Sequence, residues 1–153
     1  MEAPKGTDCK TKCKNLLAML RAMHLLHHTA HLQASGETSY QDHLLFERLY
    51  GGLVGEADGL AEKLVSLYGN DAVDAVDQAG RIDTICQRAK QASKDPIKRA
   101  YMLEEGLQDV IDAVRTSLKK EDKLSIGMDN FLQGLADTHE TACYLLKQRM
   151  RKG

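Results

Sequence analysis

Apolar residues recur at helical spacing in four long segments of this chain, and no segment alternates between apolar and polar residues as a strand does. The first predicted helix covers residues 15–33, and the second, residues 40–68, follows a short stretch rich in Ser and Gly. The third covers residues 97–118 and the fourth residues 124–150, with charged residues 119–123 between them. This pattern predicts an all-α helical bundle.

The segment between the second and third predicted helices is long and only mildly amphipathic. Residues 71–93 are compatible with a helix, although Gly80 interrupts the pattern and Pro96 closes the segment. The first two helices are joined by a tight connection, as are the last two, whereas this middle connection is long enough to run the length of the bundle. That wiring is typical of the ferritin-like four-helix bundle, here with a short helix in the crossover.

The composition fits one soluble globular domain over residues 1–153. Hydrophobic residues make up 42% and charged residues 28% of the chain, which is too apolar for a disordered protein. The net charge of −1 excludes a uniformly basic nucleic-acid binder. No apolar run reaches the roughly 18 residues of a membrane span, and the polar first residues predict no signal segment. We therefore expect a cytoplasmic protein that does not enter a membrane.

Both ends of the chain are locally basic. The tail expected over residues 1–14 has four lysines against two acidic residues, and the tail expected over residues 147–153 has four basic residues and no acidic one. Repeated many times on an assembly, such tails can bind DNA phosphates by releasing counterions. The alternative is that they only aid solubility and place cations favourably near a helix C-terminus.

Candidate metal ligands lie on one face of the second predicted helix. At about 100° per residue, four side chains point within roughly 100° of one another: His43, Glu47, Asp58 and Glu62. Carboxylates mixed with imidazole suit iron, manganese or zinc. Glu47 and Asp58, however, are about 16 Å apart along the helix axis, which is too far to share one ion. If no metal binds, this is only the solvent-exposed face of the helix.

The spacing of these residues is symmetric about one point of the helix. His43 and Glu62 have the same midpoint as Glu47 and Asp58, near residues 52–53. If two copies of the helix cross antiparallel about a two-fold axis there, His43 of one copy faces Glu62 of the other, and Glu47 faces Asp58. Four glycines, each costing about 1 kcal/mol in a helix relative to alanine, lie close to that point and would permit close approach of two backbones: Gly51, Gly52, Gly55 and Gly59. These features together predict a metal site between subunits.

The residues around these candidates resemble the Dps family of mini-ferritins. The resemblance fits without gaps from His31 to Glu62 and is fainter over residues 124–149, where His139-Glu140 lies near the corresponding family segment. The matching segments are His27-His28-Thr29-Ala30-His31, Ser35-Gly36, His43-Leu44-Leu45-Phe46-Glu47 and Ala57-Asp58-Gly59-Leu60-Ala61-Glu62.

The resemblance implies a ferroxidase that protects against oxidative stress. Such a protein oxidises Fe(II), usually with hydrogen peroxide and otherwise with dioxygen, and stores the ferric mineral in a hollow dodecamer built from two-fold dimers. DNA binding is the family's other activity. By the family pattern, a mono-iron or di-iron ferroxidase centre is shared by two subunits: His31, His43 and Glu47 come from one, and Asp58 and Glu62 from its partner. His31 enters this set through the resemblance alone.

The sequence departs from the family pattern in places and leaves other interpretations open. Glu47 stands where the family often has Asp, and Leu32 stands where a tryptophan is common. The extra histidines His24, His27 and His28 either modify the access of iron or lie on the surface, and of the two we favour the surface. One alternative is a zinc- or haem-binding bundle that uses the pair His27 and His31, four residues apart, without turnover. Another is a DNA-compacting shell with a vestigial metal site.

Overall fold

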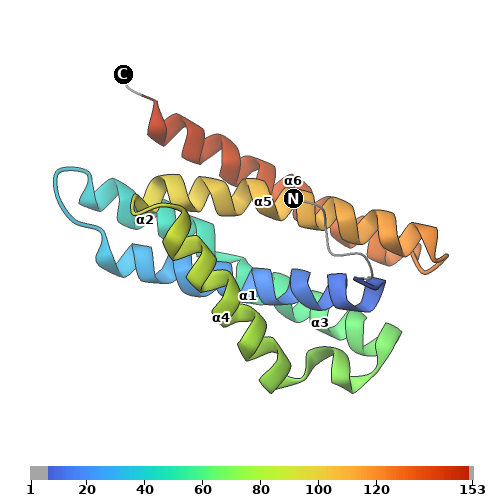
Figure 1. Ribbon diagram of the computed structural model, residues 1–153. Coiled ribbons are helices and arrows are strands. Elements are labelled where there is room, and N and C mark those ends of the chain that lie inside the picture. The colour runs from blue at the N-terminus through green and yellow to red at the C-terminus, as the bar shows by residue number, and fades with distance from the viewer. Residues whose placement is uncertain (1–6, 152–153) are drawn as a thin grey trace.

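The structure, a computed structural model, describes residues 7–151, and these residues are all-α (Figure 1). The predicted ferritin-like four-helix bundle with a helix in its long crossover is confirmed. The first helix of the bundle is continuous, and the second is divided into two shorter helices. The third and fourth are the long helices that follow the crossover. The elements are α1 (Cys9–Gln33), α2 (Ser39–Gly51), α3 (Leu53–Tyr68), a 3-10 turn (Asn70–Val73), α4 (Ala75–Ala92), α5 (Pro96–Lys120) and α6 (Ile126–Met150).

Helix α1 begins at Cys9 rather than near Asn15. Asp8 caps it by accepting a hydrogen bond from the Thr11 backbone N–H at 2.7 Å, and both Cys9 and Cys13 are buried in the core. Residues 9–14 of the segment expected to be an N-terminal tail are therefore helical. Residues 1–6 lie outside the described part of the chain.

The second helix of the bundle was predicted to be continuous, but it is divided at Gly52 into α2 and α3. Gly52 keeps near-helical angles, with φ −94° and ψ −12°, and its carbonyl still accepts a hydrogen bond from the Glu56 N–H at 3.1 Å. The break is therefore a local distortion at the Gly51–Gly52 pair, where two adjacent glycines weaken the helix.

Helix α1 is at the centre of the packing, because it contacts α2, α3, α4 and α5. Its side chains Leu16, Leu17 and Leu20 are completely buried in the main core. Helix α4, drawn in yellow-green in Figure 1, crosses α1 obliquely and connects α3 to α5.

The crossover is anchored to α1 by polar contacts. The buried Gln78 donates from Nε2 to the Lys14 carbonyl at 3.0 Å and accepts from Arg21 at 3.2 Å. Arg81 donates to the side chain of Asn15 at 2.6 Å. Gly80 does not interrupt α4.

The basic C-terminal segment belongs largely to α6. Arg149 forms an ion pair with Asp42 of α2, with 2.6 Å between Nε and Oδ1, and the Lys147 ammonium lies over the Tyr101 ring. Residues 152–153 are outside the described range. Within residues 7–151, no helix is both long and apolar enough to cross a membrane.

Candidate metal site

His31 and His43 are brought together by two reciprocal hydrogen bonds. His31 Nδ1 donates to the backbone carbonyl of His43 at 2.8 Å, and His43 Nδ1 donates to the carbonyl of His31 at 3.0 Å. The two rings stack with 3.6 Å between centroids and 24° between planes. A carbonyl can only accept, so each ring carries its proton on Nδ1. The Nε2 lone pair of each ring is then directed away from these bonds and can bind a metal.

The local sequence explains this pairing. The His31 carbonyl lies in the last turn of α1, where backbone carbonyls have no partner within the helix, and the His43 ring supplies one. Gly36, at φ +84°, adopts the left-handed conformation that the short connection requires. The chain therefore returns along α1 with His43 opposite His31.

The start of α2 is held by α6. Arg149 donates to Asp42 at 2.6 Å and to the Thr38 hydroxyl at 3.0 Å. The hydrogen bond from Arg149 is the main reason that the pKa of Asp42 lies below its usual range. These contacts fix the position of the turn of α2 that carries His43.

The three predicted carboxylate ligands remain exposed and unpaired. The side chains of Glu47, Asp58 and Glu62 form no hydrogen bond or ion pair with any other described residue. Within residues 7–151 of this single chain, no three His, Cys, Asp or Glu side chains are grouped closely enough to hold a metal ion. One chain thus assembles the histidine half of the predicted site and leaves its carboxylates facing outward.

Only some of the four glycines lie on an open surface. A Cβ at Gly51 or Gly55 would meet no atom within 4 Å, so the subunit leaves both positions free. A Cβ at Gly59 would lie 3.1 Å from the Phe131 ring of α6. Gly59 therefore has a role in packing within the chain, against α6, which the sequence did not predict.

The other histidines of α1 divide into two groups. His24 and His28 are half-buried, and their rings stack at 6.0 Å, with His28 a further 6.1 Å from His31. His27 points into the core and pairs with Glu104 of α5 at 3.1 Å. Because His27 and His31 are held by different partners, the structure gives no support to a zinc or haem clamp made of these two residues.

His27 is part of a buried network that joins four helices and was not predicted. Glu104, which is completely buried, also pairs with His139 Nδ1 of α6 at 2.5 Å, and His139 Nε2 pairs with Glu56 of α3 at 2.7 Å. Burial alone would lower the pKa of His139, but its hydrogen bonds to Glu104 and Glu56 outweigh burial and raise that pKa to about 9. Burial likewise opposes ionisation of Glu104, yet the two imidazoles lower its pKa.

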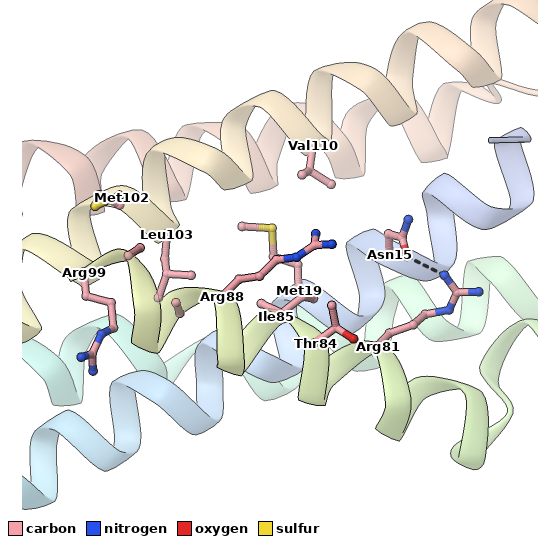
Figure 2. A pocket seen from close by; sticks show the side chains of 12 residues that line it. Asn15, Met19, Arg81, Thr84, Ile85, Arg88, Arg99, Met102, Leu103 and Val110 are labelled. Carbon is pink, nitrogen blue, oxygen red and sulfur yellow. Dashed lines mark hydrogen bonds between the residues drawn. The ribbon is translucent and has the colours of Figure 1, made fainter. Parts of the chain in front are cut away.

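A sizeable cavity is separate from the predicted ligands. It encloses about 620 Å³ between α1, α4 and α5. Arg81, Arg88 and Arg99 line it together with apolar side chains, and Figure 2 shows Arg88 reaching across its middle. None of its lining residues is a carboxylate or a histidine, so this cavity is not the metal site.

Comparison with known proteins establishes the fold. The chain is similar to Dps from Thermosynechococcus elongatus, known from an X-ray structure, with a TM-score of 0.78 and 21% identity over 95% of this chain and 91% of that one. No family model matches the sequence. No curated protein matches it either. The chain has a Dps-like ferritin fold.

Proposed function

We propose that the protein is a mini-ferritin that oxidises Fe(II) at a centre shared by two subunits and stores the ferric product in a closed homo-oligomer. The observation that carries this proposal is the reciprocal bonding of His31 and His43, which leaves both Nε2 lone pairs for a metal. The Dps-like fold supports the same conclusion.

Each proposed ligand has a distinct task. His31 and His43 bind Fe(II) through Nε2, and Glu47 of the same subunit adds a carboxylate. Asp58 and Glu62 come from the partner subunit. Anionic oxygen ligands bind the harder Fe(III) better than Fe(II), so they favour oxidation of the bound ion.

The proposed oxidant is hydrogen peroxide, with dioxygen as the alternative. Two Fe(II) ions each give one electron to peroxide, its O–O bond breaks, and two protons complete two molecules of water. Supplying both electrons at one centre limits the release of hydroxyl radicals.

The exposed carboxylates support a centre between subunits. Glu47, Asp58 and Glu62 are unpaired within the described chain, and the open positions Gly51 and Gly55 lie between them along α2 and α3. A second copy related by a two-fold axis near Gly52 would bring Asp58 and Glu62 to the histidines. A dodecamer assembled from such dimers is the form that we propose.

The first test compares peroxide-driven iron oxidation in the parent and in Asp58→Ala. Each protein is loaded anaerobically with a few Fe(II) per subunit and given a pulse of peroxide, and ferric absorbance is followed. We expect rapid oxidation in the parent and its loss in the variant. Asp109→Ala, which removes an exposed carboxylate from α5, is the matched control and should behave as the parent does. Equal slow rates in all three proteins would overturn the proposal.

DNA binding receives no further support from the described residues. Arg149 is engaged with Asp42, and Lys147 lies over Tyr101. Any role of the basic tails in binding DNA therefore depends on the remaining cations of the chain ends.

A further inference from the structure

His24 and His28 present two imidazoles on one face of α1 without a hydrogen-bonding partner. They are one helical turn apart, a separation that places Cβ atoms about 5–6 Å from each other. Their rings are nearly parallel, with 26° between planes and 6.0 Å between centroids. No other described residue hydrogen-bonds to either ring. Both side chains therefore keep ring nitrogens free to bind a ligand.

Tyr50 of α2 packs against these rings. Its ring meets those of His24, His28 and His31 edge-on, at centroid distances of 5.7, 5.0 and 5.2 Å. The imidazoles consequently form a continuous row along α1, which ends at the stacked pair of His31 and His43.

We propose that His24 and His28 form a second binding site for a divalent transition-metal ion, a two-imidazole clamp one turn from the His31–His43 pair. Two imidazoles four residues apart on a helix are a recurrent chelating arrangement for borderline ions such as Zn²⁺, Co²⁺ and Fe²⁺, with water completing the shell. The rings converge on one ion by rotating about their broad Cβ–Cγ torsions.

The surroundings of the clamp suit a hydrated cation. His24 lines a pocket of about 250 Å³ together with Asp58, whose unpaired carboxylate adds negative charge. Arg21 also lines this pocket, but its guanidinium donates to Gln78 of α4. Burial, followed by the neighbouring His28 and His27, lowers the pKa of His24 and so favours the neutral ring, the form that binds metals.

The neighbouring pair with the same spacing cannot act in this way. His27 is buried, and its Nε2 is paired with Glu104 of α5, so it cannot join His31 in holding an ion. The clamp is therefore specific to His24 and His28 among the histidines of α1.

The clamp gives Fe(II) a binding position on the way to the proposed ferroxidase centre. The row of rings passes from His24 through His28 to His31 in steps of about 6 Å. This role in iron delivery rests on the proposed function, whereas metal binding by the clamp does not.

The test of binding counts Co²⁺ ions per subunit by calorimetric titration and by the visible spectrum of bound Co²⁺. Four proteins are compared: the parent, Asp58→Ala, His28→Gln and the variant with both changes. We expect His28→Gln to lose one Co²⁺ per subunit in either background. An unchanged stoichiometry would overturn the clamp. His24→Gln is the second variant and should lose the same ion, with folding of each variant checked by circular dichroism.

A spacing control separates the clamp from nonspecific binding to histidine. The double variant His28→Gln, Thr29→His keeps the number of histidines but moves one ring to a different face of α1. We expect it to lack the same Co²⁺ ion as His28→Gln does. Recovery of that ion would overturn the proposed geometry.

Iron delivery has its own readout. At low Fe(II), His28→Gln should oxidise iron several-fold more slowly than the parent, with little change at saturating Fe(II). Equal rates at low Fe(II) would overturn the delivery role. If the parent shows no rapid oxidation but still binds the Co²⁺ that depends on His28, the proposed function fails and the clamp stands.

Discussion

At the scale of single residues, His139 shows how the fold changes the chemistry of a side chain. It lies between Glu104 and Glu56 with hydrogen bonds at both ring nitrogens, and only 3% of its side chain is exposed. The two carboxylates favour the charged imidazolium strongly enough to overcome burial, and its pKa rises to about 9. Removing one member of such a network leaves a buried charge without a partner, which is strongly destabilising.

This shift predicts a pH dependence of stability. The ordinary pKa of 6.5 is expected for His139 in the unfolded chain, so the folded state holds the proton more tightly. The stabilisation is complete below about pH 6.5 and is lost as the pH rises through about 9, with a total of about 3 kcal/mol. The free energy of unfolding by urea, measured from pH 6 to 10, should fall over this range in the parent and much less in His139→Gln. Parallel curves for the two proteins would contradict the prediction.

Single residues also show where sequence reasoning falls short. Glu104 and Glu56 were not predicted, because a charged residue on a helix normally marks its solvent-exposed side. One signal was present: Glu104 is adjacent to Leu103 on the face of α5 that also carries Ala100 and Leu107, where a core residue is expected. The partner that makes such burial tolerable, His139, is 35 residues away, and only the fold shows that the two meet.

At the scale of elements, hydrophobic periodicity predicted the four bundle helices and the crossover, but not every helix boundary. It missed the first turns of α1 because three lysines are interspersed with the buried Cys9 and Cys13 ahead of the leucines. It joined α2 and α3 because periodicity continues across Gly52. Periodicity could not predict the stacking of His31 on His43, because this stacking depends on how the chain turns between α1 and α2.

The glycines of these helices give a prediction at the same scale. A Cβ at Gly55 of α3 or at Gly80 of α4 would meet no atom within 4 Å, so alanine should raise helix stability by up to about 1 kcal/mol at either position. If Gly55 permits close approach of two subunits, Gly55→Ala should weaken the dimer, whereas Gly80→Ala should leave assembly unchanged. Thermal unfolding and sedimentation of both variants make the comparison. Equal assembly of the two would place Gly55 outside the interface.

At the scale of the whole molecule, the described part of the chain assembles only part of the predicted metal site. It holds its histidines together and its carboxylates exposed, and the coincident midpoints of His43–Glu62 and Glu47–Asp58 point to a two-fold axis as the means of completing the site. The symmetry was visible in the sequence because helical spacing is regular. The identity of the face that meets the partner depends on which side chains the rest of the fold buries.

A shared centre predicts that two inactive subunits can complement each other. In a mixed dimer of His43→Ala and Asp58→Ala, one centre carries both changes, but the other receives intact histidines from one subunit and intact carboxylates from its partner. Random pairing makes half of the dimers mixed, so about a quarter of all centres should be active. Peroxide-driven iron oxidation by the co-expressed proteins should therefore recover to about a quarter of the parent rate.

The matched control for this experiment pairs His31→Ala with His43→Ala. Both changes affect the half of the centre that one subunit supplies, so every centre in every dimer keeps one defect and no activity should return. If His43→Ala and Asp58→Ala also fail to complement, while each variant still assembles with the parent, the two residues do not act in one shared centre. Recovery in the first mixture alone would require that each centre draw on two chains, because no single subunit in that mixture carries a complete set of ligands.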